Sequence, residues 1–273
     1  ADVPNDQIKW LSENLGDELS IHNYLGTYYF GFNLTKEPFK DAPKLREALT
    51  LAIDRDIITD KVTGVGEKPA YGIVPPGIHG YDNYIPEYAT LDKAARIEKA
   101  KKLYEEAGYG KDKPLKVDLL YNTSENHKKI AVAVAAMWKQ NLGVQTNLTN
   151  QEWKVFLNTR TEKKQTEAFR AGWIGDYNDA YSFLELFQSK SGLNDSGYAS
   201  EKYDALLAQA AQEQDMAKRA AILKEAEKML TDDYPVAPIY SYVTKRLVKP
   251  YVKGYADENV MDHRSSKYMW IEK

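Results

Sequence analysis

Cysteine is absent from this sequence of 273 residues. Its absence excludes disulfide bonds, catalysis by a thiolate, and zinc or iron–sulfur centres held by cysteine. Histidine is scarce, and its four copies, His22, His79, His127 and His263, show no spacing typical of metal ligands. No apolar run approaches the roughly 18 residues that a membrane span needs. We therefore expect no metal, no cofactor and no membrane-spanning segment.

Sequence motifs of common catalytic and nucleotide-binding sites are missing as well. Gly64-Val65-Gly66 lacks the third glycine of a dinucleotide fingerprint, and Gly110-Lys111 lacks the spacing of a phosphate loop. No nucleophile elbow or Ser/Lys motif is present, which argues against a peptidase or amidase. The net charge of −3 creates no field that favours nucleic acid. We therefore expect a protein that is neither an enzyme nor a nucleic-acid binder.

From residue 90 onward, hydrophobic periodicity indicates alternating strands and helices. We expect strands over 115–121, 144–150 and 168–173, with helices over 125–142 and 151–160 between them. This order indicates parallel strands joined by right-handed crossovers. Other expected elements are helices over 7–15, 43–53, 91–107, 180–188, 201–213 and 215–230, and strands over 25–33, 236–243 and 268–271. Asp41 and Thr90 are the expected N-caps of the helices that begin near 43 and 91, and 63–90 is expected to be an ordered functional loop.

Polar and aromatic residues follow each of the three parallel strands, at the edge where ligands of open sheets bind. The groups are Asn122-Thr123-Ser124 with His127, Gln151-Glu152-Trp153 with the nearby Arg160, and Gly175-Asp176-Tyr177-Asn178. Such groups can meet an extended peptide. Amides bind its backbone, an acid binds its N-terminus, and arginine or histidine binds its C-terminal carboxylate.

The segment 170–179 carries the most informative of these signals. It begins as a buried strand, breaks at Gly172 and Gly175, and then presents Trp173 beside Asp176. A carboxylate supplies charge and an aromatic wall excludes water, which is what a site for a peptide's terminal ammonium requires. A surface turn capped by the aspartate, with the tryptophan in the core, is the alternative.

Structural explanations stay open for the other groups too. The residues 122–124 suit a helix N-cap, and His127 fits a surface helix position. Arg160 can pair with a local glutamate. Arg170 lies inside a strand, where a buried ion pair explains it as well as a ligand contact does.

Together these residues resemble the periplasmic oligopeptide-binding proteins of bacterial ABC peptide importers, solute-binding protein family 5. The similarity runs from Ala1 to Lys273. The stretches that carry it are Gln7-Ile8-Lys9-Trp10-Leu11, Tyr24-Leu25-Gly26-Thr27-Tyr28-Tyr29, Leu119-Leu120-Tyr121-Asn122-Thr123-Ser124, Asn150-Gln151-Glu152-Trp153-Lys154, Arg170-Ala171-Gly172-Trp173 with Asp176-Tyr177-Asn178, and Arg246-Leu247-Val248-Lys249-Pro250.

The resemblance implies an α/β fold: a periplasmic binding protein-like class II lobe, with a mixed, mostly parallel sheet flanked by helices. Full-length members of the family are about twice this length, so the chain looks like the C-terminal half. On this basis 27–243 is the second, peptide-binding lobe. The segments 1–26 and 244–273 belong to the first lobe, most of which, like the signal peptide, is expected to lie outside this chain.

The resemblance also implies a function. Such proteins capture peptides between two lobes by hinge closure and deliver them to the membrane permease subunits of an ABC importer, without covalent chemistry. We expect a monomer in the periplasm or on the extracytoplasmic face of the membrane. Two alternatives stay open: a murein-peptide or other specialised binder of the same family, and an isolated lobe without ligand affinity.

Site residues carry over position by position from the resemblance. Asp176 matches the acid that binds the peptide's α-ammonium. The positions that match the lining of the cleft are Asn122, Trp153, Gly172, Trp173 and Tyr242. The basic matches are Arg160, Arg170 and His127, and those that meet peptide carboxylates are Arg160 and His127. Ile174 is also expected in the site, although Ile174, Asp179 and Ala180 differ from the relatives' loop. Thr63 replaces a lysine that binds a carboxylate in close relatives, which keeps the murein-peptide alternative open.

Overall fold

The computed structural model describes residues 3, 7–164, 166–255 and 259–272. Its centre is a six-stranded sheet in the order β2-β6-β1-β5-β3-β4. The strands are β1 (Leu19–Phe32), β2 (Lys68–Pro69), β3 (Lys116–Asn122), β4 (Gln145–Gln151), β5 (Ala168–Ile174) and β6 (Val236–Leu247). Strand β3 is parallel to β4 and β5, whereas β1 is antiparallel to β5 and β6. Strands β3 to β6 therefore point the same way, and the expected mixed, mostly parallel sheet is confirmed.

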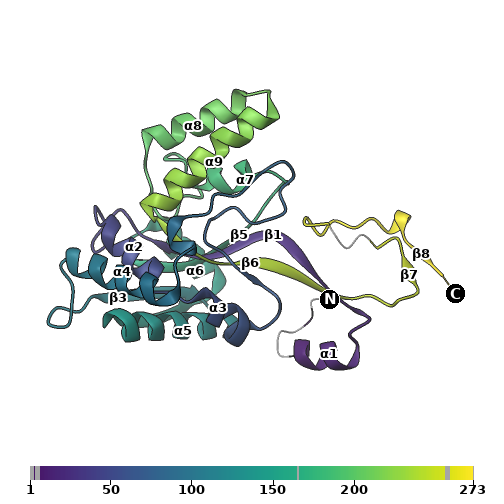
Figure 1. Cartoon of the computed structure of the whole chain (residues 1–273), viewed down its shortest axis with the longest axis horizontal. Coiled ribbons are helices and arrows are strands. Elements are labelled where there is room, and N and C mark those ends of the chain that lie inside the picture. Colours follow the sequence, from purple (N-terminus) through teal and green to yellow (C-terminus); the bar gives the residue numbers. More distant parts are fainter. Residues whose placement is uncertain (1–2, 4–6, 165, 256–258, 273) are drawn as a thin grey trace.

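Helices cover both faces of this sheet (Figure 1). One face carries α2 (Pro43–Leu51), α4 (Lys93–Glu106) and α5 (Glu125–Leu142), whose apolar side chains form one buried cluster with Tyr28 and Phe30 of β1. The other carries α6 (Trp153–Glu162), α7 (Tyr181–Leu184), α8 (Glu201–Gln212) and α9 (Met216–Asp233), which form a second cluster with Tyr29. Shorter elements are α1 (Ile8–Asn14), α3 (Arg55–Ile57), the π-helical turn η2 (Ile58–Thr63), and the 3₁₀ turns η3 (Glu87–Ala89), η4 (Glu185–Phe187) and η5 (Ser266–Tyr268).

The aromatic run of β1 follows from its central place in the sheet. Alternate residues of a strand point to opposite faces, and both faces of β1 are covered, so both sets are apolar. Gly31 of β1 is paired with Phe169 of the neighbouring strand β5. A Cβ on Gly31 would lie 2.3 Å from the phenyl ring of Phe169. The close fit of this pair requires glycine.

Two expected helix caps are wrong. Asp41 has a left-handed φ of 51° and precedes the true N-cap of α2, Ala42, which makes no side-chain cap bond. Thr90 donates its hydroxyl to the carbonyl of Glu87, and Asp92 caps α4 by accepting from the backbone of Ala95.

Strands β1 and β6 extend beyond their expected ends, to Leu19 and Leu247. Their outer parts pair with each other, and a bulge between Asn23 and Thr27 interrupts the register. This two-stranded ribbon leads out of the helical layers towards α1 and towards the small sheet of β7 (Val252–Lys253) and β8 (Trp270–Ile271) (Figure 1).

The stretch 63–90 is ordered, as expected. Its short strand β2 pairs with β6, and the side chains of Ile73, Val74 and Ile78 are buried in the second cluster. Tyr88, near its end, is buried in the first cluster and donates its hydroxyl to the carbonyl of Tyr71. The loop therefore wraps around the edge of the sheet and contacts both helical layers.

Candidate ligand-binding site

The last residues of β3, β4 and β5 lie at one edge of the sheet. Asn122 is in register with Gln151, and β5 runs parallel beside β3 before it ends at Ile174. Strand β6 points the same way and brings Tyr242 to the same region. The loops that follow these strands therefore gather on the carboxyl edge, where ligands of open sheets bind.

Arg170 of β5 is the centre of a polar group at this edge. Its Nη2 donates to the hydroxyl of Tyr242 at 2.9 Å and its Nη1 to Oδ1 of Asn122 at 3.4 Å. The guanidinium lies 4.7 Å from the ring centre of Tyr28. Among the described residues no carboxylate forms an ion pair with it, and its buried Nε has no hydrogen-bond partner. The buried ion pair considered for Arg170 is therefore wrong, and its partners are neutral.

His127 contributes to the same group from the first turn of α5. Its ring centre lies 5.6 Å from that of Tyr28, and its Nδ1 is buried without a hydrogen-bond partner. Burial, together with the charge of Arg170, lowers the pKa of His127 to about 3. The imidazole is therefore neutral at pH 7 and offers a hydrogen bond rather than a positive charge. The N-cap interpretation of 122–124 is confirmed, because Ser124 accepts from the backbone of His127.

The end of β5 packs closely against β6 and β1. A Cβ on Gly172 would lie 2.6 Å from the hydroxyl of Tyr242, and a Cβ on Gly26 would lie 2.4 Å from Cδ1 of Ile174. The indole of Trp173 is half-buried, and its Nε1 has no hydrogen-bond partner. The two glycines thus let Tyr242 approach the strand beside Trp173.

Asp176 lies two residues beyond β5 and is exposed. Its backbone N–H donates to Oγ of Ser182 at 3.0 Å, which fixes the chain at this position. Among the described residues its carboxylate forms no ion pair. A negative group that is held by its backbone and open to solvent can receive a cation.

Helix α6 places Trp153 and Arg160 differently. Trp153, at the beginning of the helix, is 46% exposed, and its ring centre lies 5.9 Å from that of Phe156. Arg160, two turns further on, forms an ion pair of 2.6 Å with Asp195. The prediction that Arg160 forms a structural ion pair is confirmed, but its partner is the distant Asp195 and not a local glutamate. Arg160 thus has a counter-charge, whereas Arg170 forms no ion pair within the described part of the chain.

Thr63 is part of a buried pair that the sequence did not reveal. Its hydroxyl donates to Oε2 of Glu67 at 2.9 Å, and both residues are buried. Burial chiefly, and then the phenols of Tyr242 and Tyr28 and the charge of Glu67, raise the pKa of Tyr240. Burial also raises the pKa of Tyr242, where Arg170 opposes the shift and Glu67 adds to it. Glu67 therefore lies near the Arg170 group, and neither it nor Tyr28 could be distinguished from ordinary core or loop residues by sequence pattern.

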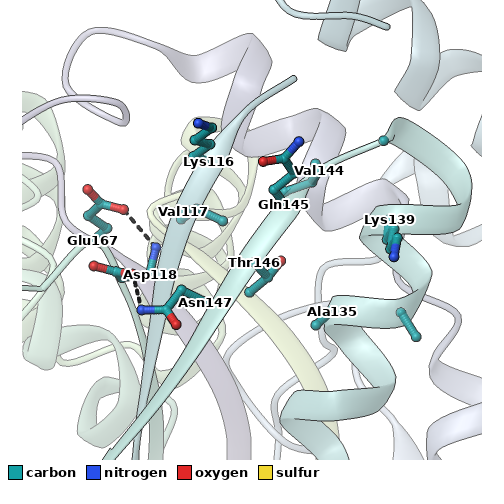
Figure 2. A pocket seen from close by; sticks show the side chains of 12 residues that line it. Lys116, Val117, Asp118, Ala135, Lys139, Val144, Gln145, Thr146, Asn147 and Glu167 are labelled. Carbon is teal, nitrogen blue, oxygen red and sulfur yellow. Dashed lines mark hydrogen bonds between the residues drawn. The ribbon is translucent and has the colours of Figure 1, made fainter. Parts of the chain in front are cut away.

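A hollow of about 930 Å³ lies away from this group, between β3, β4 and α5. Figure 2 shows that Lys116, Asp118, Gln145 and Asn147 line it at the beginnings of the two strands. This is the amino edge of the sheet. Among the described residues, no cluster of histidine and acidic side chains could hold a metal ion, and no helix is long and apolar enough to cross a membrane.

Comparison with known proteins agrees with this arrangement. Residues 1–195 match the family described as bacterial extracellular solute-binding proteins, family 5 middle. The chain belongs to this family. It is 43% identical to the periplasmic oligopeptide-binding protein OppA of Escherichia coli (strain K12) over 271 residues, which are 99% of this chain and 50% of that protein. Its identity to the periplasmic murein peptide-binding protein MppA of the same organism is also 43%, and this match again covers 99% of this chain and 50% of that protein.

Solved structures of family 5 relatives have the same fold. The Escherichia coli murein tripeptide binding protein MppA superposes with a TM-score of 0.90 at 42% identity, covering 100% of this chain and 53% of that one. Haemophilus influenzae OppA in complex with RPPGFSPFR superposes with a TM-score of 0.87 at 42% identity. This match covers 99% of this chain and 53% of that one. The expected periplasmic binding protein-like fold is confirmed. The chain spans about half the length of the curated relatives it matches.

Proposed function

We propose that this chain is the peptide-binding half of an extracytoplasmic solute-binding protein that captures short peptides and delivers them to the permease of an ABC importer. The observation that carries the proposal is a pair of charges, one on β5 and one on the loop after it, that form no ion pair with any residue the structure describes. Asp176 is an open carboxylate, and Arg170 is a cation held by neutral partners. The two termini of a peptide carry the complementary charges.

The proposed mechanism is capture without covalent chemistry. Asp176 receives the α-ammonium beside the wall of Trp173, and Arg170 attracts the carboxylate while neutral His127 supplies a hydrogen bond. Asn122, Gly172, Ile174, Tyr242 and Trp153 line the path of the peptide. Arg160 is the weakest member of the proposed set, because Asp195 already neutralises it.

We further propose the expected division of the chain. Residues 27–243 form the second lobe, and 1–26 and 244–273 belong to a first lobe completed by the rest of a longer protein. The support is the ribbon of β1 and β6, whose register is interrupted between Asn23 and Thr27, at the proposed boundary. A bulge concentrates twist and bending at one point, which suits a hinge. The proposed location is the periplasm, where the named relatives act.

A specialised murein-peptide binder is the second candidate. Its support is that MppA is as similar to this chain as OppA is. The family resemblance also implies that Thr63, which here binds Glu67, replaces a lysine that binds a carboxylate in relatives. A panel of ordinary and murein tripeptides separates the two candidates. Preference for a murein tripeptide by more than an order of magnitude would favour the second.

The decisive experiment replaces Asp176. In the full-length protein, we expect Asp176→Asn to weaken peptide binding by about 3–5 kcal/mol, because the ligand's ammonium would be desolvated without its counter-charge. Titration calorimetry with a pool of tri- to pentapeptides measures the loss. Asp118→Asn, at the opposite edge of the sheet, is the matched control and should bind like the wild type. Equal affinities of wild type and Asp176→Asn would overturn the proposal, and cleavage of the peptides during the titration would overturn its non-enzymatic part.

A further inference from the structure

An ion pair ties the loop that carries Asp176 to helix α9. Arg219 places Nη1 2.6 Å from Oδ2 of Asp179 and Nη2 3.1 Å from Oδ1. The side chains are only 18% and 22% exposed, and the guanidinium also lies 5.9 Å from the ring centre of Tyr181. A bidentate contact of this kind fixes orientation as well as distance. It therefore differs from an isolated surface ion pair, which contributes little.

The loop itself is short and held at both ends. The backbone N–H of Gly175 donates to the carbonyl of Leu25 at 2.8 Å, and that of Asp176 donates to Ser182. Asp179 turns the chain back, because its Oδ1 also accepts from the backbone of Tyr181 at 2.8 Å. The carboxylate of Asp179 thus joins the local turn to a distant helix. Release of this carboxylate would remove one constraint on the segment that presents Asp176, while the bonds of Gly175 and Asp176 remain.

We propose that Arg219 is a positioning residue for ligand binding: it holds Asp179 so that Asp176 is oriented before the ligand arrives. The inference rests on the proposed function, in which Asp176 receives a peptide ammonium. A loop that is ordered in advance loses less conformational freedom on binding, and this raises affinity without a new contact.

The first test uses two variants of opposite charge. Arg219→Met removes a positive charge, and Asp179→Asn removes a negative one. If the pair acted on the ligand's ammonium only through its field, one variant would tighten binding and the other would weaken it. Loss of positioning weakens binding in both, by roughly 3- to 10-fold for a tripeptide. Arg219→Lys, which retains the charge and one hydrogen bond, should recover part of the loss.

The matched control is Lys224→Met on the same helix. Lys224 forms an ion pair of 2.6 Å with Asp82, which is outside the Asp176 loop. Its loss changes the net charge as Arg219→Met does, and affinity should stay within twofold of wild type. In an Asp176→Asn background, Arg219→Met should cause no further loss, because the group that it orients is gone. Equal losses in both backgrounds would assign Arg219 a general structural role and overturn the proposal.

A measurement without ligand keeps this inference separate from the proposed function. In the full-length protein, Arg219→Met should accelerate hydrogen exchange of the backbone amides of 176–182 relative to wild type and to Lys224→Met. The helix amides around Leu223 should be unchanged, which also verifies folding. Unchanged exchange in 176–182 would overturn the positioning role. Failure of the wild type to bind any peptide would overturn the proposed function and leave the exchange result to decide the role of Arg219.

Discussion

His127 shows how one buried side chain makes stability depend on pH. Its pKa is lowered from an ordinary value of 6.5 to about 3 by burial and by the neighbouring Arg170. Between these values the unfolded chain binds a proton that the folded chain does not. The free energy of unfolding therefore falls as the pH falls below 6.5, and the loss reaches about 2 kcal/mol at pH 5.

The test of this prediction compares urea unfolding at pH 7.5 and pH 5. His127→Asn should remove the loss of about 2 kcal/mol that His127 contributes, because asparagine does not titrate. His263→Asn, at an exposed position near the end of the chain, should keep it. If wild type and His127→Asn changed by the same amount between the two pH values, the proposed neutrality of His127 in the folded state would be wrong.

At the scale of elements, α9 holds the 63–90 loop through a buried carboxylate. Oε2 of Glu227 accepts from the hydroxyl of Tyr81 at 2.7 Å and from the backbone of Tyr84 at 3.0 Å. A Cβ on Gly72 would lie 2.7 Å from Oε1, so glycine is needed where the loop passes this carboxylate. Burial raises the pKa of Glu227 to about 7, although its hydrogen bonds and Lys224 oppose the shift.

The direction of the resulting pH dependence is opposite to that of His127. Between pH 4.5 and 7 the folded chain holds a proton on Glu227 that the unfolded chain has lost. The free energy of unfolding therefore falls as the pH rises, and the loss reaches about 3 kcal/mol at pH 8. Glu227→Gln keeps an oxygen acceptor and should remove this component in urea unfolding between pH 5 and pH 8. Glu225→Gln, which breaks an exposed pair with Lys202, is the control and should retain it. Identical profiles for the two variants would contradict the prediction.

Elements were easier to predict from the sequence than the contacts between them. The strands and helices of 115–174 follow from periodicity and from stop signals such as Gly143, which ends α5 with a φ of 77°. The order of these elements places their loops at one edge, so the candidate site could be located. The partners could not be found, because Asp195 and Arg219 reach Arg160 and Asp179 across 35 and 40 positions. Neither local propensity nor spacing encodes such pairs.

At the scale of the whole molecule, apolar surface is distributed unevenly. The two large clusters lie within the helical layers, whereas the third, small cluster joins Val3, Ile8 and Leu11 to Val65. Large aromatic side chains beyond the ribbon of β1 and β6 are open to solvent: Trp10 is 54% exposed, and Trp270 is 58% exposed. Apolar surface of this kind on segments that lead away from the main body is typical of an interface.

The proposed division of the chain predicts where chymotrypsin cuts. In the isolated chain, cleavage should begin at the exposed aromatic residues Trp10, Tyr268 and Trp270 and leave a resistant fragment that contains 27–243. In the full-length protein these rings would be buried against the rest of the first lobe, so cleavage there should be slower by an order of magnitude or more. Timed digestion with mass spectrometry measures both rates. Equal rates at Trp10 and Trp270 in the two proteins would contradict their place in a first lobe. Early cuts within 27–243 would contradict the lobe itself.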